Sequence, residues 1–336
     1  IFTKFTLIMH SGRQYSLKEF LIWTRFDIYK LALIAIIPTL AFQLLGWNFV
    51  AIPWVPIALI GTAAAFIVGF KNTQTYNRLW EARQIYGGIV NTSRTIGMMT
   101  KDFIKADRNT HLEIINRHCA WLTAMRYQLR ETRSWENMGK NYYVEYSKFY
   151  RIEERETKLE DELKKYLSEE EFAYILSKKN RATQIISLQS KHFKQLAEEG
   201  KIENFRYIQL SNRLADLYDH QGKCERIKNF PYPRQFASIN SFFIQLFVLM
   251  LPFGMLNEFQ KIGEDFVWLT IPFTIVVGWV FTSMEKVGES TENPFEGNPN
   301  DVPITAMSRT IEIDLKDMLD VADLPKPLSP VNNILM

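Results

Sequence analysis

Charged residues are distributed unevenly along the chain, and a long stretch near its beginning has none. Residues 31–70 contain no Asp, Glu, Lys or Arg. A membrane-spanning helix needs about 20 apolar residues, so this stretch is long enough for two of them. Because Gly46-Trp47-Asn48 can form a turn midway, we expect one span at 28–46 and a second at 52–70.

Two more charge-free stretches lie in the last third of the chain, at 235–257 and 266–284. Together they predict a second helical hairpin over 235–284. The alternative is that all four segments are buried core helices of a soluble protein. Four segments of near-spanning length, grouped in two hairpins, disfavour that alternative. The pattern therefore predicts an all-α membrane protein with four transmembrane helices.

The basic residues predict how these helices are oriented. No Lys or Arg lies between the first two spans, and only Lys261 lies between the last two. By the positive-inside rule, three segments are then cytoplasmic, namely 1–27, 71–234 and 285–336, in a multi-pass protein of the cell membrane. Residues 1–25 lack the apolar run and the cleavage site of a signal peptide.

The cytosolic region 71–234 is rich in charged helix-forming residues. Within it, the mixed charge of 150–200 predicts a solvated pair of amphipathic helices. After the last span, Met307 to Leu319 alternates apolar and acidic residues as a short surface helix does. Residues 324–336 contain prolines and have no packing pattern, so we expect a tail.

Composition excludes several function classes. The net charge of +3 gives no excess for nucleic-acid binding, and two cysteines, Cys119 and Cys224, are too few for a disulfide scaffold. No phosphate-binding loop, dinucleotide-binding motif or zinc-protease motif occurs, which disfavours a membrane-bound enzyme. His111 and His118 are expected to share a solvated helix face, with a metal site as the less common alternative.

The second span carries two stripes of side chains at a spacing of four. Gly61, Ala65 and Gly69 form a stripe of small residues, which allows membrane helices to pack closely. Thr62, Phe66 and Phe70 form the neighbouring stripe. These side chains either line a narrow apolar constriction or fill the core of a helix bundle, and spacing alone leaves both open.

Three ordered segments resemble the bestrophin family, in particular its bacterial members. The first is GFKNTQTYNRLWEARQIYGGIVNTSR at 69–94, with the family's Tyr-x-Arg-x-Trp element. The second is KCERIKNFPYPRQF at 223–236, which resembles the family's lead into the third span. The third is GESTENPFEGNPNDVPITAMSRTIEIDLKDML at 288–319, with the Asn-Pro-Phe element. The charged stretch 130–205 has no such match.

The resemblance implies a homopentamer in the lipid bilayer, with one central ion pathway. Thr62, Phe66 and Phe70 fall on the family's three neck positions, and Thr62 replaces a bulkier residue there. It also implies a lower cytosolic aperture, for which Ile208 is the best match and Phe205 the second choice. The segment from Asp301 onward is implied to wrap neighbouring subunits and to inhibit the pore.

Calcium is the point where the chain departs from its animal relatives. Those relatives hold calcium partly through a dense acidic run after Asn-Pro-Phe. Here Asn293-Pro294-Phe295 is followed by one Glu and one Asp, Glu296 and Asp301, whereas calcium requires about six or more oxygen ligands. We therefore expect no cofactor and no calcium activation, with Asp301 as a weak remnant of the clasp.

The function implied is a passive channel for small monovalent ions. Phe at two neck positions favours anions such as chloride, because the ring edge carries positive partial charge. The alternatives are a cation-selective channel of the same type and a non-conducting membrane scaffold.

Overall fold

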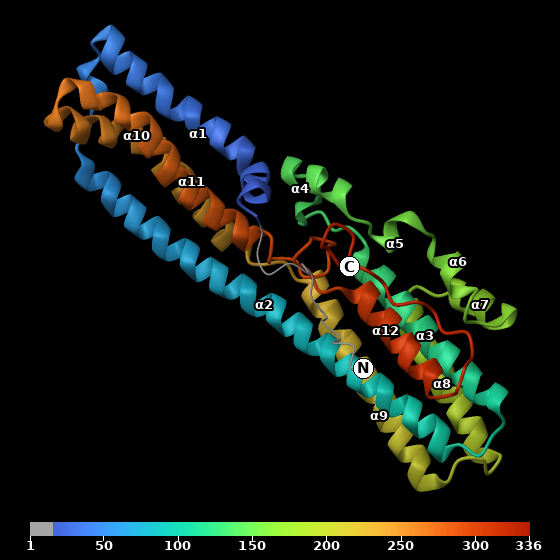
Figure 1. Ribbon diagram of the computed structural model, residues 1–336. Helices are drawn as coiled ribbons and strands as arrows, with labels where there is room; N and C mark the ends of the chain where they lie inside the picture. Colours follow the sequence, from blue (N-terminus) through green and yellow to red (C-terminus); the bar gives the residue numbers. More distant parts are fainter. Residues whose placement is uncertain (1–15) are drawn as a thin grey trace, which may run out of the picture.

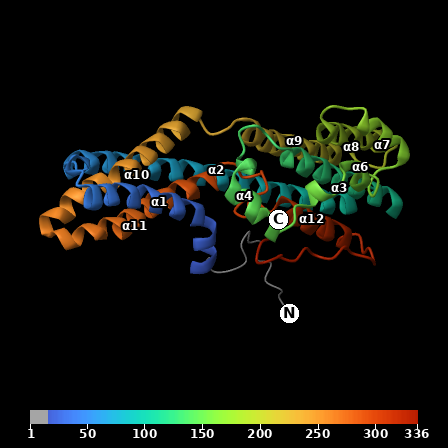
Figure 2. The same cartoon turned by 90° about the horizontal axis from the view of Figure 1, so that it is seen from above.

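The computed structural model describes residues 16–336, and in these residues the backbone is helical apart from turns, loops and two isolated β-bridges. The helices form a membrane part and an extramembrane part, which lie end to end along one long helix, α2 (Trp54–Phe103) (Figures 1 and 2). Helix α2 belongs to both parts. The predicted all-α fold is confirmed.

The membrane part consists of α1, the first half of α2, α10 and α11 (Figure 1). Its other helices are α1 (Leu17–Leu45), α10 (Arg234–Ile262) and α11 (Thr270–Glu289), with the short 3₁₀ helices η1 (Asn48–Val50) and η4 (Glu264–Leu269) in the two turns. Four helices of the described chain are long and apolar enough to cross a membrane. The predicted number of spans is thus confirmed.

Helix α1 begins well before the expected residue 28. Ser16 caps it, since the Ser16 hydroxyl accepts a hydrogen bond from the Glu19 amide (3.2 Å) and the Glu19 carboxylate accepts one from the Ser16 amide (2.7 Å). The helix ends at Gly46, whose positive φ of 67° suits glycine. The charge-free stretch predicted the apolar centre of α1 correctly, but it did not predict the polar first turns of this helix. Residues 1–15 of the expected cytosolic segment 1–27 lie outside the described chain.

Helix α2 does not end with the charge-free stretch. It runs for 50 residues, which corresponds to a length of about 75 Å. The chain has no proline between Pro56 and Pro231, so nothing breaks the helix after the membrane. The expected boundary at residue 70 is therefore not a boundary of secondary structure.

Four helices form the extramembrane part together with the second half of α2. They are α3 (Arg108–Arg130), α8 (Arg181–Glu198), α9 (Asn204–Asn229) and α12 (Ile304–Asp317). Three of them pack against α2, while α8 packs against α3 and α9. Their core holds the largest buried side chains of the described chain, among them Trp121, Tyr86, Phe193 and Phe295. The Trp121 indole donates to the Gln221 side chain at 2.9 Å, so this core also satisfies its polar groups.

Short helices cover the outer edge of this part (Figure 1). They are η2 (Asn137–Gly139), α4 (Asn141–Tyr146), η3 (Ser147–Phe149), α5 (Glu153–Glu156), α6 (Leu159–Leu163) and α7 (Glu169–Leu176). The predicted pair of solvated helices at 150–200 is wrong. Three short helices precede α8, and α8 packs against α3 by burying Ile185, Ile186 and Phe193.

The C-terminal region is packed at α12 and at the last residues of the tail. Helix α12 buries Ile311 and Leu315 and is no surface helix, and a methyl group at Gly97 of α2 would lie 2.5 Å from Leu315. The tail is exposed over 326–333, as expected, but Ile334 and Met336 are buried with Tyr150 and Ile152. The Ala306 amide donates to the Met336 carbonyl at 2.8 Å. Two buried residues are too few to give a periodic signal in the sequence.

The two histidines of α3 do not share a solvated face. His118 is buried, and its Nε2 lies 2.8 Å from the Ser93 hydroxyl of α2. Burial lowers the pKa of His118 to about 4, so the ring is neutral. His111 instead contacts the Ile104 carbonyl at 3.0 Å. The His118 ring thus connects α3 to α2, and the His111 ring connects α3 to the turn between the two helices.

Candidate functional site

The three predicted neck residues lie on α2, and all three are exposed. Phe66 is 77% exposed and Phe70 is 47% exposed, and Thr62 is exposed as well. The Thr62 hydroxyl donates to the Ala58 carbonyl at 2.9 Å, so it is satisfied within the helix. These side chains thus form an exposed face, which we call the neck face.

The opposite face of α2 packs against α10 and α11. Its buried residues include Ile57, Gly61, Ala64 and Val68. A methyl group at Gly61 would lie 2.5 Å from the Phe247 ring of α10, so the two helices approach closely there. This contact fixes the rotation of α2 and thereby the direction of the neck face.

Only Gly61 of the predicted small-residue stripe takes part in this contact. Ala65 is exposed, and no atom lies within 4 Å of a methyl group placed on Gly69. Residues four apart drift by about 40° around a helix, so the stripe turns from the packed face toward the neck face. Ala65 and Gly69 are therefore available to a neighbour outside this chain.

The Phe70 ring contacts one of a pair of aromatic side chains, a contact that the sequence did not predict. Its ring lies 6.2 Å from that of Phe236, and Tyr232 lies 6.5 Å from Phe236 in turn. Phe236 lies in the first turn of α10, and Tyr232 lies just before this helix. The proline-flanked aromatics at 230–236 were the only sequence signal for this contact.

Beyond the apolar stretch, the neck face carries mainly uncharged polar side chains. Thr73, Asn77, Gln84 and Asn91 follow along the same side of α2, and all four are exposed. The exposed ring of Trp80 lies among them. Their spacing keeps them on one side of a helix with 3.6 residues per turn. A single side of α2 therefore changes from aromatic to mainly polar along its length.

Two sets of contacts fix α2 just below Phe70. The Asn72 side chain donates to the Met284 carbonyl at 3.0 Å, and the Thr291 hydroxyl donates to the Thr75 hydroxyl at 2.9 Å. Further along, one guanidinium nitrogen of Arg78 donates to two carbonyls at the end of α9, those of Ile227 and Phe230. The Tyr-x-Arg-x-Trp element thus supplies a structural clamp, a role the sequence analysis missed.

The two aperture candidates lie at the far end of the extramembrane part. Phe205 is 77% exposed and Ile208 is 54% exposed, both near the beginning of α9. Between them, Arg206 lies over the Phe103 ring at the end of α2. Since the last turns of α2 are about 35 residues beyond Phe66, the neck and these candidates are about 50 Å apart.

The Asp301 carboxylate is engaged by protein groups. Its Oδ2 accepts from the amides of Gly297 (2.6 Å) and Asn298 (3.0 Å) and lies 3.4 Å from Arg130. Burial raises the pKa of Asp301 to about 7 and that of Glu296 to about 8. Among residues 16–336, no three candidate metal ligands gather in one place. The contacts of Asp301 brace the loop that follows Asn-Pro-Phe.

Comparison with known proteins agrees with this arrangement. The profile of the family described as "Bacterial/Fungal Bestrophin protein" matches residues 23–317. A protein of Salmonella typhi named "Voltage-dependent anion channel-forming protein YneE" is 27% identical over 307 residues, which cover 90% of this chain and 87% of that protein. A protein of Ralstonia nicotianae with the same descriptive name, RSc3414, is 26% identical over 269 residues, covering 79% of this chain and 76% of the relative.

A solved structure has a similar fold. The crystal structure of a bacterial bestrophin homologue from Klebsiella pneumoniae superimposes with a TM-score of 0.75 at 26% sequence identity. The match covers 88% of this chain and 98% of that one. It therefore includes both the membrane part and most of the extramembrane part.

Proposed function

Because this chain belongs to the bacterial and fungal bestrophin family, we propose that it is an ion channel that conducts small monovalent ions passively, with anions such as chloride preferred. The channel is a homopentamer in the cell membrane. The neck face of α2 from each subunit surrounds the pore, and Ile208 forms the lower aperture. Both termini and the extramembrane part are cytoplasmic. Family membership argues for a channel and against an enzyme.

The observation that carries this proposal is the neck face itself. An exposed aromatic side chain in a membrane helix faces either lipid or a pore. The exposed side chains of α1 and α11 are apolar along the span, for example Leu33, Ile37 and Val276, as lipid requires. On α2, the side that carries Phe66 continues into polar residues, which favours water along that side.

Pentamer formation would also explain the small residues that have no neighbour in this chain. Ala65 and Gly69 lie between the packed face and the neck face, where an adjacent copy of α2 would approach. Small side chains at that place allow neighbouring helices to come close around a narrow pore. We assign both residues to the contact between subunits.

The preference for anions rests on the ring edges of Phe66 and Phe70 and on the uncharged polar surface below them. Ring edges carry positive partial charge, and the stripe from Thr73 to Asn91 adds no carboxylate beside the path. The relatives that are named as anion channel-forming proteins support the same preference for anions. A cation-selective channel is the alternative with the same architecture.

Reversal potentials test this proposal directly. The purified protein, in a planar bilayer with a tenfold KCl gradient, should give a potential near the chloride limit of about 59 mV in magnitude. A potential near the potassium limit, of opposite sign, would establish the cation-selective alternative. An absence of current, with the pentamer intact by size-exclusion chromatography, would favour the non-conducting scaffold.

A further inference from the structure

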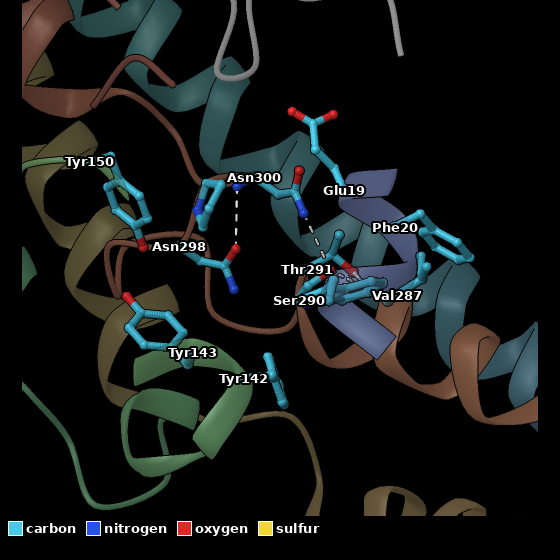
Figure 3. Close-up of a pocket in the computed structure, with 12 residues that line it drawn as sticks. Glu19, Phe20, Tyr142, Tyr143, Tyr150, Val287, Ser290, Thr291, Asn298 and Asn300 are labelled. Atoms are coloured by element: carbon cyan, nitrogen blue, oxygen red, sulfur yellow. Dashed lines mark hydrogen bonds between the residues drawn. The ribbon is translucent and has the colours of Figure 1, made fainter. Parts of the chain in front are cut away.

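A cavity of about 290 Å³ lies apart from the neck face, where four segments meet (Figure 3). These segments are the beginning of α1, the end of α11, the helix α4 and the loop 297–300. Five aromatic side chains form much of its wall, namely Phe20, Trp23, Tyr142, Tyr143 and Tyr150. The cavity therefore suits a flat apolar molecule.

The aromatic wall is held in place from behind. The Lys286 ammonium lies 4.7 Å from the centre of the Tyr142 ring and 5.4 Å from that of Trp23, and this ammonium lies outside the cavity lining. The Tyr142 hydroxyl donates to the Glu289 carboxylate at 3.2 Å. A wall that is already fixed lowers the entropy cost of binding.

One hydrogen-bond donor at the cavity has no partner in the described chain. Asn298 lines the cavity, and its Oδ1 accepts from the Asn300 amide (3.3 Å), while its Nδ2 makes no hydrogen bond there (Figure 3). The aromatic wall offers this donor no acceptor, so an acceptor supplied by a ligand would be favourable here.

The charge of the lining selects a neutral ligand. Among the described residues, the lining has no basic side chain and one carboxylate, that of Glu19, which already accepts from Ser16. A carboxylate or phosphate on the ligand would lose its hydration without gaining a counter-charge from these residues. We propose that this cavity binds a small neutral molecule with a planar apolar body and one carbonyl-type acceptor, which Asn298 binds. This proposal does not depend on the channel function.

Titration calorimetry with 2-naphthamide tests the proposal, because this neutral two-ring amide has the shape and the acceptor required. The full chain is used in lipid nanodiscs, and the heat of 2-naphthamide with empty nanodiscs is subtracted. We expect saturable binding of one molecule per chain. An absence of saturable binding up to the solubility limit would overturn the proposal.

Two variants locate the ligand. Asn298→Asp replaces the amide donor by an acceptor and keeps the oxygen that accepts from Asn300, so it should weaken binding about fivefold or more, the value of one hydrogen bond. Val287→Trp places an indole in the cavity from an exposed position of the wall and should abolish binding. Asn204→Asp, which makes the same change at an exposed position of α9 outside the cavity lining, is the matched control and should bind as the wild type does.

The variants also separate the parts of the proposal. Unchanged affinity in Val287→Trp would overturn the site and assign the binding to lipid or to another surface. Loss in Val287→Trp together with unchanged affinity in Asn298→Asp would overturn the assigned hydrogen bond. Circular dichroism and size-exclusion chromatography confirm that each variant is folded before the titration.

Discussion

The membrane part and the extramembrane part share one helix, yet they pack against it by different means. In the membrane part, α2 is in contact with α10 through Gly61, Ala64 and Val68, with no side-chain hydrogen bond at that place. In the extramembrane part, the contacts of α2 include the Ser93–His118 hydrogen bond and a large aromatic core. The same helix is thus held by close apolar contact alone around Gly61, and by close contact together with specific polar pairs in the extramembrane part.

The difference follows from the two solvents. Lipid tails are as apolar as the side chains they surround, so helices in a bilayer gain little from the hydrophobic effect and depend on close packing. In water, apolar burial supplies the main driving force and buried polar groups need partners. A buried pair such as Lys228 and Glu136, at 3% and 2% side-chain exposure, therefore occurs in the extramembrane part.

The largest expected effect comes from breaking that buried pair. Lys228→Met leaves the Glu136 carboxylate buried without its cation, which should lower the free energy of unfolding by about 3–5 kcal/mol. The matched control is Lys223→Met, whose partner Asp219 is 62% exposed, so the loss should stay below about 1 kcal/mol. Thermal unfolding followed by circular dichroism measures both. Equal losses of unfolding free energy in the two variants would show that the buried ion pair stabilises the extramembrane part no more than an exposed pair does.

The corresponding test in the membrane part is Gly61→Ala. The added methyl group would clash with the Phe247 ring, so we expect a loss of about 1–3 kcal/mol from overpacking. Gly69→Ala, at a position with open space in this chain, is the control. Thermal unfolding in detergent that dissociates the oligomer compares the two variants within single chains. Similar losses in both would contradict the assigned packing face.

The stability of the extramembrane part should depend on pH because Glu296 is buried. The pKa of Glu296 is raised to about 8 in the folded chain, from a usual value of 4.5, chiefly by burial. Between these values the folded state binds more protons than the unfolded state, so stability should fall as the pH rises, by at most about 1.4 kcal/mol per unit.

Glu296→Gln should reduce this slope, and Glu131→Gln, with 60% side-chain exposure, should leave it unchanged. Denaturant midpoints from pH 5 to pH 9 give the slopes. A wild-type stability that is constant over this range would refute the role of Glu296.

The smallest energetic effect is expected at the neck face. Phe66→Ala combined with Phe70→Ala widens the proposed constriction and should raise single-channel conductance severalfold, with altered relative permeability of anions. Phe273→Ala, at an exposed position of α11, is the control and should leave the currents unchanged. Unchanged currents in the double variant would identify the two rings as packing residues.

The sequence predicted the parts of the fold that depend on composition over a long stretch. Stretches without charge located four membrane helices, and the spacing of Thr62, Phe66 and Phe70 placed these residues on one side of a helix. A run of twenty apolar residues is a signal that few other structures produce, and helical periodicity is strict enough to assign a face.

The parts it missed depend on contacts between distant residues. Nothing near His118 indicates that Ser93 lies beside it, and the burial of Ile334 and Met336 depends on Tyr150 and Ile152 far away in the chain. The clamp made by Arg78 likewise requires the end of α9 to be in place. Such pairs follow from tertiary structure and leave no periodic pattern in the sequence.

The unbroken course of α2 has a mechanical consequence. A helix of 50 residues without an internal proline past its first turn behaves as a stiff lever, clamped near its middle by Asn72, Thr75 and Arg78. A tilt of about 3° around this fulcrum would displace positions some 40 Å away by about 2 Å, given the rise of 1.5 Å per residue. The neck face and the proposed aperture are therefore coupled by geometry, so that a force applied at the distal end of the rod also moves Phe66.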